Sequence, residues 1–564
     1  MRRRLAAILG ILLLLGGCVA VPTSGPVERQ SPAQQQPNPG VEIAPVPPAQ
    51  GASPGLIVEG FLHAMATYQP GYAVAREFLT TAASEQWHPE SGVEIYAGGY
   101  PPEVSDSGVV LTAPLVGTLN NQGSFTPTSN QYHHDFGLIR NEDGQWRISR
   151  PPRGLLISQS LFNSTWVRSD VCFWDASGSW LVPDPRFVQK GNVGMVSTVR
   201  AVLAGPATAH QAYRPPLEFS LDVSMVTLNA GGVATVELTG QVDAMDADDR
   251  HRLAAELVWS LSSLEGVTGL RIRGNGALWD VGGTAGTVTT ADFEQGAPEV
   301  VTSSDQAFLI RDGALQRANW DEPSTEPQAV GGALNRPTAV AARLDGQVLG
   351  VVTDGGTKLR TVSVREGGNR VELGGARFIG VRWTRQGELW CTVDREGGAR
   401  LRMVRDGRET PIDTSGVPTG RIKAFAPAPD GVRVALVIED RGRSSLGLAA
   451  MVRTDDGIEF VGWRNLSGAT WTPGSQPALD VGWSGPATLL VLLGGGTLTR
   501  VVSVDSEGAV ATDVGPGDAP ALTQVAVSSS ERAVLRGSDG QTWRFVSEFT
   551  WEPWLAKVQQ VSLP

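Results

Sequence analysis

The segment P-T-A-V-A-A-R-L-D-G at residues 337–346 is the first clear copy of a motif that recurs through the second half of the chain. Each copy joins an apolar run to a polar turn, and the copies centre on Val340, Val381, Phe425, Val481 and Val525. They lie about 40–45 residues apart with one longer step, a period typical of β-propeller blades. A second apolar run follows each copy, at residues 348–352, 389–393, 434–438, 489–493 and 533–535. The pattern predicts an all-β propeller over residues 298–564.

The number of blades depends on how many units are counted. A degenerate unit at residues 300–317, added to the five clear copies, makes six blades, and five or seven remain open. A pair of β-sandwiches is the alternative all-β fold, but it would not give so steady a period. We therefore expect six blades.

Residues 169–284, ahead of the propeller, alternate strand and helix signals. The second helix carries leucines on one face, and the first ends at Ala204-Gly205-Pro206, a typical helix stop. The expected segments are strands at 172–175 and 180–183, a helix at 196–203, strands at 224–228 and 234–238, a helix at 248–264 and a strand at 267–273. The order β-α-β-β-α-β predicts a two-layer α+β domain with both helices on one face of the sheet.

Four aspartates near the start of the second helix form the one dense carboxylate cluster: Asp243, Asp246, Asp248 and Asp249. A calcium loop needs a glycine for its turn and a late bidentate glutamate, and this spacing lacks both. Negative side chains at a helix N-terminus are stabilised by the helix dipole. We therefore expect these aspartates to begin the helix and to bind no metal.

Residues 54–168 form the first predicted domain, a small α+β unit. Ser53 and Pro54 are typical of a helix start, and apolar residues at helical spacing follow in two segments. Strand-like segments come next, at residues 93–97, 109–116, 135–140 and 146–148. Adjacent residues on a strand point to opposite faces, so His133 and His134 are not expected to share a metal ion.

The linker ahead of this domain, residues 18–53, is rich in proline, glutamine and serine and almost lacks large apolar residues. Such a segment cannot bury enough surface to offset its conformational entropy. We predict a disordered spacer.

The chain begins with Arg2, Arg3 and Arg4, an apolar run over residues 5–15, and then Gly16-Gly17-Cys18. This is the pattern of a secretory signal peptide, and the run is shorter than the ~20 residues that span a bilayer. The alternatives are an ordinary signal peptide that happens to contain Cys18, or a membrane helix. With cysteine after the small pair, the segment resembles the lipobox of bacterial lipoproteins. That resemblance implies a signal peptide over residues 1–17, cleavage between Gly17 and Cys18, and acylation of the Cys18 thiol. The rest of the chain would then lie on the extracytoplasmic face of the cell membrane, held by its lipid.

Charge and cysteine usage exclude several classes of function. The net charge is −12, and loss of the three arginines with the signal peptide makes it −15. This charge argues against nucleic-acid binding and against adsorption to anionic lipid. Cys172 and Cys391 lie in strand-like apolar contexts in separate predicted domains. We expect buried free thiols in preference to a disulfide.

A search for catalytic motifs finds none. The sequence has no HExxH, G-x-S-x-G, P-loop or S-x-x-K, and Gly274-Asn275-Gly276 lacks the third glycine of a dinucleotide loop. We therefore predict no catalytic, cofactor-binding or metal-binding residue, and no enzyme activity. A glycan-acting enzyme with two distant carboxylates stays open as a weaker alternative, because such a pair leaves no local motif.

Together these segments resemble the LpqB lipoprotein family of actinobacteria. The resemblance rests on C-V-A-V-P-T-S at residues 18–24, V-E-G-F-L-H-A at 58–64, Y-A-V-A-R-E-F-L-T at 72–80 and the propeller repeats. The middle domain is similar to a GerMN domain through V-R-A-V-L-A-G-P, G-V-A-T-V-E-L and L-A-A-E-L-V-W-S-L. The tail over residues 549–564 matches the family pattern poorly, which leaves closure of the propeller open.

The resemblance implies a function that the residues alone do not. It implies a lipoprotein that binds and modulates the sensor histidine kinase of an Mtr-type two-component system, and so affects envelope homeostasis and cell division. A cell-wall ligand is the alternative partner, because other envelope lipoproteins carry GerMN units. No binding residue is predicted beyond the lipid site at Cys18.

Overall fold

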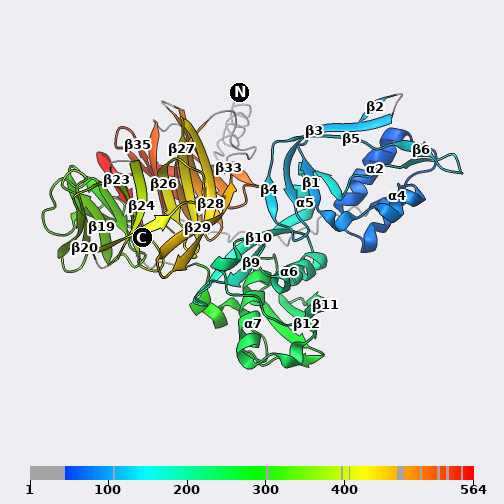
Figure 1. Ribbon diagram of the computed structural model, residues 1–564, viewed down its shortest axis with the longest axis horizontal. Helices are drawn as coiled ribbons and strands as arrows, with labels where there is room; N and C mark the ends of the chain where they lie inside the picture. Colours follow the sequence, from blue (N-terminus) through cyan, green and yellow to red (C-terminus); the bar gives the residue numbers. More distant parts are fainter. Residues whose placement is uncertain are drawn as a thin grey trace, which may run out of the picture. The chain divides into compact units, whose positions relative to one another are not determined.

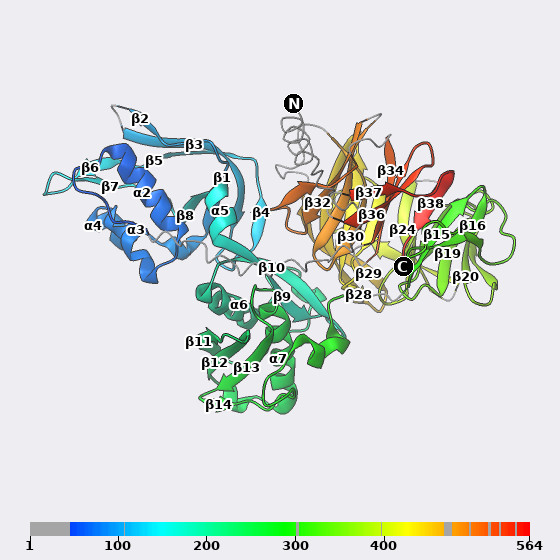
Figure 2. The same ribbon diagram turned by 180° about the vertical axis from the view of Figure 1, so that it is seen from behind.

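The structure is a computed structural model that describes residues 45–564, except for 106–107, 300–303, 396–397, 406, 467–475, 496–497, 517–520, 529–531 and 548–549. The predicted signal peptide, the cleavage site at Gly17 and Cys18, and residues 18–44 of the predicted linker lie outside the described residues. Within the described part of the chain, no helix is both long and apolar enough to cross a membrane. Figures 1 and 2 show the described elements from two opposite sides.

The N-terminal α+β region begins with helix α2 (Pro54–Ala66), as predicted. The Ser53 side chain accepts a hydrogen bond from the backbone N–H of Leu56 and so caps this helix. The second predicted helix is shorter than expected and divided, because Tyr72 has a left-handed backbone with φ of 54°. The further helical segments are η1 (Pro70–Tyr72), α3 (Ala73–Glu77), α4 (Thr81–Gln86), η2 (Pro89–Ser91) and α5 (Gln159–Thr165).

The strands of this region form a mixed sheet in the order β2-β3-β1-β8, with β4 and β5 also paired to β3, and a separate hairpin of β6 and β7. The predicted strand over residues 135–140 is divided into β5 and β6, because the chain turns at Gly137 (φ 60°) after burying Phe136. Helix α2 packs against β8 (Figure 2). The strands are β1 (Val93–Tyr96), β2 (Glu103–Ser105), β3 (Gly108–Leu119), β4 (Phe125–Pro127), β5 (Gln131–Asp135), β6 (Leu138–Arg140), β7 (Trp146–Ile148) and β8 (Leu155–Ser158).

The two adjacent histidines on β5 have different partners. A ring nitrogen of His133 lies 3.0 Å from the hydroxyl of Thr112, whereas Nε2 of His134 lies 2.9 Å from the backbone carbonyl of Arg150. The prediction that their side chains do not share a face is confirmed.

The middle α+β domain contains both predicted helices. Helix α6 ends at Gly205, whose φ of 84° favours glycine. Helix α7 is capped by Asp246, which accepts a hydrogen bond from the backbone N–H of Asp249, so the helix-start interpretation of the aspartate cluster is confirmed. The elements are β9 (Trp166–Trp174), β10 (Leu181–Gln189), α6 (Asn192–Ala204), η3 (His210–Ala212), β11 (Leu221–Leu228), β12 (Val233–Gly240), η4 (Val242–Ala244), α7 (Ala247–Leu261), β13 (Gly269–Gly274), β14 (Ala277–Leu278) and η5 (Thr290–Gly296).

The strands of the middle domain form two sheets where a single sheet was expected. Strands β11 to β14 make one sheet, whereas β9 and β10 pair only with each other (Figure 2). The free edge of β9 is covered by helix α7 instead of by a strand. Ser260 of α7 accepts a hydrogen bond from the backbone N–H of Cys172, and Glu256 accepts one from Trp174. Polar side chains on the helix therefore satisfy an edge that a neighbouring strand would otherwise pair.

The C-terminal region is all β. By their pairing, its described strands form six antiparallel quartets, the arrangement that six blades require; β22–β25 and β26–β29 join into one eight-stranded sheet through a parallel contact of β25 with β29. The first half comprises β15 (Gln306–Arg311), β16 (Ala314–Asn319), β17 (Gln328–Ala329), β18 (Ala339–Ala342), β19 (Val348–Thr353), β20 (Lys358–Ser363), β21 (Asn369–Gly374), β22 (Arg377–Trp383), β23 (Leu389–Arg395), β24 (Gly398–Arg405), β25 (Arg408–Asp413) and β26 (Arg421–Pro427). The second half comprises β27 (Arg433–Asp440), β28 (Arg443–Thr454), β29 (Gly457–Asn465), β30 (Ala478–Gly485), β31 (Thr488–Gly495), β32 (Leu498–Asp505), β33 (Ala511–Asp513), β34 (Leu522–Val527), β35 (Ala533–Gly537), β36 (Thr542–Ser547), β37 (Thr550–Pro553) and β38 (Val558–Ser562).

The predicted strand positions in this region are confirmed. All five motif copies lie on the first strand of a quartet, and the apolar runs that follow them lie on the second. Cys391 is buried in a cluster of the propeller and Cys172 in the core of the middle domain, and no disulfide joins these two described cysteines.

The tail of the chain closes the propeller, which the sequence left open. Strand β38 pairs antiparallel with β15, so the degenerate unit takes its missing strand from the far end of the chain. Gln524 of β34 holds β38 from one side, since its amide donates to the carbonyl of Val561 at 2.8 Å and accepts from the N–H of Val561 at 3.2 Å. From the other side, the hydroxyl of Ser562 accepts a hydrogen bond of 3.0 Å from the N–H of Ala342 on β18.

Candidate functional site

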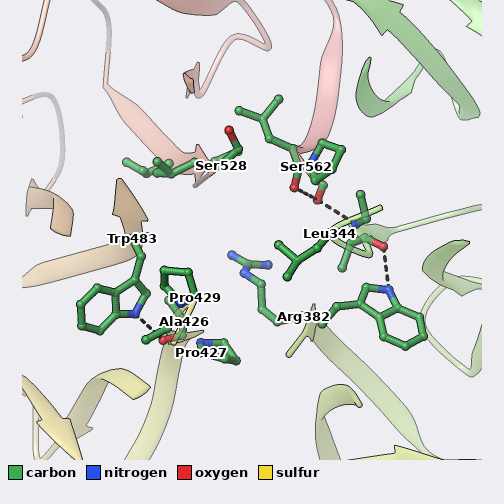
Figure 3. Close-up of a pocket in the computed structure, with 18 of the residues that line it drawn as sticks. Leu344, Arg382, Ala426, Pro427, Pro429, Trp483, Ser528 and Ser562 are labelled. Atoms are coloured by element: carbon green, nitrogen blue, oxygen red, sulfur yellow. Dashed lines mark hydrogen bonds between the residues drawn. The ribbon is translucent and has the colours of Figure 1, made fainter. Parts of the chain in front are cut away.

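One edge strand of each quartet contributes to the wall of a cavity of about 110 Å³ (Figure 3). Strands β18, β22, β26, β30, β34 and β38, with the turns that follow them, all contribute to its lining. Close approach of neighbouring strands is built into the sequence at Gly482, because a Cβ there would lie 2.6 Å from a methyl group of Val527. The cavity is therefore a product of ring closure and depends on every quartet.

Two tryptophans fix the strands around this cavity in the same way. The indole N–H of Trp383 on β22 donates to the carbonyl of Ala341 on β18 at 3.2 Å. The indole N–H of Trp483 on β30 donates to the carbonyl of Ala426 on β26 at 2.9 Å (Figure 3). Each bond links the first strand of one quartet to that of the quartet before it.

Two arginines reach this lining, and they differ in how they are held. Arg385 donates hydrogen bonds to the carbonyls of Ala297 and Pro429, and its guanidinium lies 4.7 Å from the ring centre of Trp180. Burial lowers the pKa of Arg385 to about 10. In contrast, the guanidinium of Arg382 points into the cavity (Figure 3).

The chemistry available in the cavity is that of binding. Its walls are mainly alanine, valine, proline, leucine and tryptophan side chains, and its polar groups are the two guanidinium groups, the hydroxyls of Ser528 and Ser562 and the backbone. Such a lining can hold a ligand through hydrogen bonds and apolar contacts.

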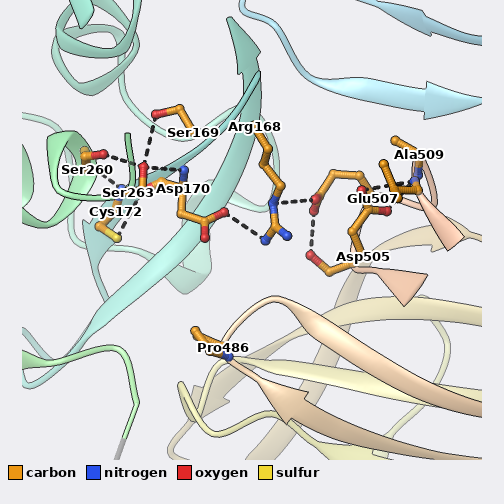
Figure 4. Close-up of polar contacts among 12 residues, drawn as sticks. Arg168, Ser169, Asp170, Cys172, Ser260, Ser263, Pro486, Asp505, Glu507 and Ala509 are labelled. Carbon is orange, nitrogen blue, oxygen red and sulfur yellow. Dashed lines mark hydrogen bonds and ion pairs between the residues drawn. The ribbon is translucent and has the colours of Figure 1, made fainter. Parts of the chain in front are cut away.

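A second cluster of charged residues joins the middle domain to the propeller (Figure 4). Arg168 of β9 lies between two acids, with Nη2 2.8 Å from an oxygen of Asp170 and Nε 3.3 Å from an oxygen of Glu507. The Glu507 side chain is fully buried; it also pairs with Arg464 at 3.5 Å and accepts a 2.5 Å hydrogen bond from the Ser506 hydroxyl.

Apolar packing reinforces this contact. Val432 and Ala450 of the propeller belong to the same hydrophobic cluster as the core of the middle domain. Beside them, Arg433 is buried; it pairs with Asp430 at 2.7 Å and lies 5.0 Å from the ring centre of Trp483. The middle domain and the propeller therefore share a buried interface that contains ion pairs.

Burial raises the pKa values of two acids at this interface, Asp170 and Asp505. Desolvation raises the pKa of Asp170 against the opposing effect of Arg168. Desolvation, together with the negative charge of Glu507, raises the pKa of Asp505 to about 7. No sequence motif could reveal this cluster, because Arg168 and Glu507 come from opposite halves of the chain.

Glu256 gives the middle domain a pH-dependent stability that can be measured. Burial raises its pKa from the usual value near 4.5 to about 7. Between pH 4.5 and 7 the folded state therefore holds a proton on Glu256 that the unfolded state has released. The stabilisation that the protonated side chain provides is full below pH 4.5 and is lost as the pH rises through 7. We expect Glu256→Gln to flatten the dependence and to be more stable than the wild type by about 3 kcal/mol at pH 8.

Urea unfolding at pH 5 and pH 8 measures the effect of Glu256→Gln. The exposed Glu265 of the same domain supplies the control, and Glu265→Gln should follow the wild-type curve. Equal losses of stability with pH in Glu256→Gln and the wild type would contradict a protonated Glu256.

Of the residues singled out in the sequence, Gly17 and Cys18 lie outside the described part of the chain. In the aspartate cluster, Asp246 caps α7 and Asp243 accepts a hydrogen bond of 2.9 Å from the Asn275 side chain. The two histidines contact Thr112 and the carbonyl of Arg150. Sequence analysis did not identify Arg382, Arg168 or Glu507. The only available signal was for Arg382, which lies in the second copy of the repeated motif, next to Trp383.

Three family models match the chain in order. Residues 47–163 match the N-terminal domain of lipoprotein LpqB, and residues 313–560 match the LpqB beta-propeller domain. Between them, residues 170–278 match the Germane family, whose description is "Sporulation and spore germination". The domain boundaries predicted at residues 54, 169 and 298 stay predictions. Among solved structures, the chain is similar to one from the nidogen/laminin complex at 11% identity and a TM-score of 0.35, over 46% of this chain and 97% of that one.

Curated relatives match across almost the whole length. Lipoprotein LpqB of Cutibacterium acnes is 29% identical, with 99% of each chain covered. The Streptomyces coelicolor protein of the same name is 27% identical over 97% of each chain, and that of Mycobacterium tuberculosis is 26% identical over 77% of this chain and 78% of its own. With an LpqB N-terminal domain, a Germane domain and an LpqB propeller in one chain, the protein belongs to the LpqB lipoprotein family.

Proposed function

We propose that this protein is anchored through acylated Cys18 to the extracytoplasmic face of the cell membrane and acts there by binding another protein. The partner is the outer domain of the sensor histidine kinase of an Mtr-type two-component system, as the family resemblance implies. Binding shifts the kinase between its signalling states and so affects envelope homeostasis and cell division.

The observation that carries a binding role is the cavity of the propeller. Its lining offers hydrogen-bonding and apolar groups on a rigid ring, held by the Trp383 and Trp483 hydrogen bonds. Membership of a lipoprotein family supports the anchor. A long proline-rich segment between Cys18 and the first domain supports reach from the membrane surface.

The energetic demand on such a partner is small. A ten-fold change in signalling requires about 1.4 kcal/mol of difference in affinity for the two kinase states. Because both proteins are held at one membrane, their effective concentration is high, and a micromolar interaction in solution suffices.

Deletion of the gene tests the proposal, with phosphorylation of the response regulator as the readout. We expect the deletion to change phosphorylation, wild-type protein to restore it, and Cys18→Ala to be released from the membrane fraction and to fail to restore it. Fractionation after a carbonate wash measures release from the membrane, and lipid labelling measures acylation. Cys18→Ala should lose both membrane association and the lipid label completely.

Each outcome bears on a different part of the proposal. A Cys18→Ala protein that stays membrane-bound would contradict the lipid anchor, and full rescue by the secreted form would make tethering irrelevant. If deletion leaves phosphorylation unchanged, the kinase is not the partner, and retention on purified peptidoglycan then tests the cell-wall ligand.

A further inference from the structure

We propose that the propeller cavity is a carboxylate-binding site in which Arg382 binds an acidic side chain of the partner protein. This inference rests on the proposed binding function and adds a chemical class of ligand and a residue to it. It starts from the placement of one guanidinium group.

Arg382 presents hydrogen-bond donors that the described protein groups leave unused. Its guanidinium donates one hydrogen bond, of 2.9 Å, to the carbonyl of the preceding residue, Val381. No described carboxylate forms an ion pair with it, whereas Arg168, Arg433 and Arg453 in the same protein all pair with acids. A guanidinium has five N–H donors in a planar fork, so most of them remain available to a ligand.

The charge around the cavity favours an anion. Its lining contains Arg382 and Arg385 and no aspartate or glutamate, although acids outnumber bases 58 to 46 in the whole chain. The buried carboxylate of Asp480 is not part of the lining, but it accepts hydrogen bonds from the N–H groups of two lining residues, Val481 (3.0 Å) and Val525 (2.9 Å). Burial raises the pKa of Asp480, and the charges of Arg382 and Arg536 oppose that rise. The lining itself therefore carries two cations and no carboxylate.

The shape and walls of the cavity favour a carboxylate over a phosphate. Arginine binds a planar carboxylate through two parallel hydrogen bonds, and a single free guanidinium is enough for that geometry. A phosphate dianion presents three acceptor oxygens and is usually held by several free cations or a helix N-terminus. Of the two arginines in this lining, Arg385 is already bonded to the carbonyls of Ala297 and Pro429, which leaves only Arg382 free for a ligand. The apolar side chains of Pro427, Leu344 and Val527 suit the methylene groups that carry a glutamate carboxylate.

Two capped peptides, Ac-Gly-Glu-Gly-NH2 and Ac-Gly-Gln-Gly-NH2, serve as probes for the full-length, unanchored Cys18→Ala protein. Saturation-transfer NMR titrations measure their affinity. We expect the glutamate peptide to bind at least ten-fold more tightly than the glutamine peptide, and Arg382→Gln to remove that preference. Arg365→Gln is the matched control, because it removes the same charge from an exposed turn of the propeller and should keep the preference.

Two sets of outcomes would contradict the proposal, one for the site itself and one for its carboxylate ligand. Equal binding of the two peptides, or a preference that survives Arg382→Gln, contradicts the site. Inorganic phosphate that displaces the glutamate peptide more effectively than acetate does contradicts the assignment to carboxylate.

A signalling test separates the site from the function. If Arg382→Gln abolishes peptide binding but restores regulator phosphorylation fully in the deletion strain, the site exists and its occupant is not the kinase. A deletion strain with normal phosphorylation contradicts the proposed function and leaves the peptide result standing.

Discussion

Removal of residues 558–564 should unfold the propeller. These residues include strand β38, whose Val558 and Val561 are 2% exposed, and Leu563, which is 7% exposed. Exposing three such side chains costs about 1.5–3 kcal/mol each. The deletion also leaves β15 without a partner on one edge and leaves the buried amide of Gln524 without its two hydrogen bonds. Together these losses approach or exceed the whole stability of a typical domain, about 5–15 kcal/mol.

Circular dichroism and thermal melting of the unanchored protein measure this effect. We expect the deletion to lose most of the cooperative strand signal. Gln560→Ala lies in the same strand with its side chain half-buried, and it should melt close to the wild type. A deleted protein that keeps a cooperative transition within a few degrees of the wild type would show that the ring does not depend on β38.

Arg168→Met should have the second largest effect, at the interface between the middle domain and the propeller. Arg168 pairs with Asp170 and Glu507, and the Glu507 side chain has no exposure to solvent. Removal of one partner of a buried ion pair typically costs about 3–5 kcal/mol. We expect a loss near the lower end of this range, because Arg464, 3.5 Å from Glu507, still compensates part of the buried charge. Protease cleavage between the two domains should become faster, and unfolding should separate into two transitions.

Two further variants show whether the effect comes from charge. Arg168→Met combined with Glu507→Gln removes both charges and should recover part of the loss. Arg200→Met breaks an exposed pair with Asp222 (3.9 Å) and should cost less than about 1 kcal/mol. A single Arg168→Met variant as stable as Arg200→Met would contradict a structural role for the buried pair.

Local patterns were sufficient to predict most of the fold. The helices α2, α6 and α7 have caps or stops next to apolar faces, and the repeated motif marks the first strand of a quartet at Val340 and Val381. These features depend on residues close in sequence. The separate ribbon of β9 and β10 was missed because hydrogen bonds from α7 side chains replace a strand, and propensity does not report such a substitution.

The closing strand was missed for a local reason as well. In a regular strand, Val558 and Val561 would point to opposite faces, and the segment would not look like a half-buried strand. The register of β15 with β38 shifts between Ile310 and Arg311, because Gln559 is an extra residue on β38. This bulge turns Val558 and Val561 into the same hydrophobic cluster. The site residues were harder to predict than the strands. Arg382 becomes recognisable as a candidate binding residue only when the closed ring places it in a cavity.

Closure by the last strand also determines the order in which the protein can fold. The contact between Arg311 and the carbonyl of Ala556 joins residues 245 positions apart, so the quartet that comes first in the sequence is completed last. Closing such a long loop lowers the conformational entropy of the chain before the new contacts can stabilise it, and this slows folding. Until β38 is available, the inner edge of β15 stays unpaired, and an unpaired edge can join a neighbouring chain. The time between the appearance of β15 and the arrival of β38 is therefore the period in which this protein is most prone to aggregate.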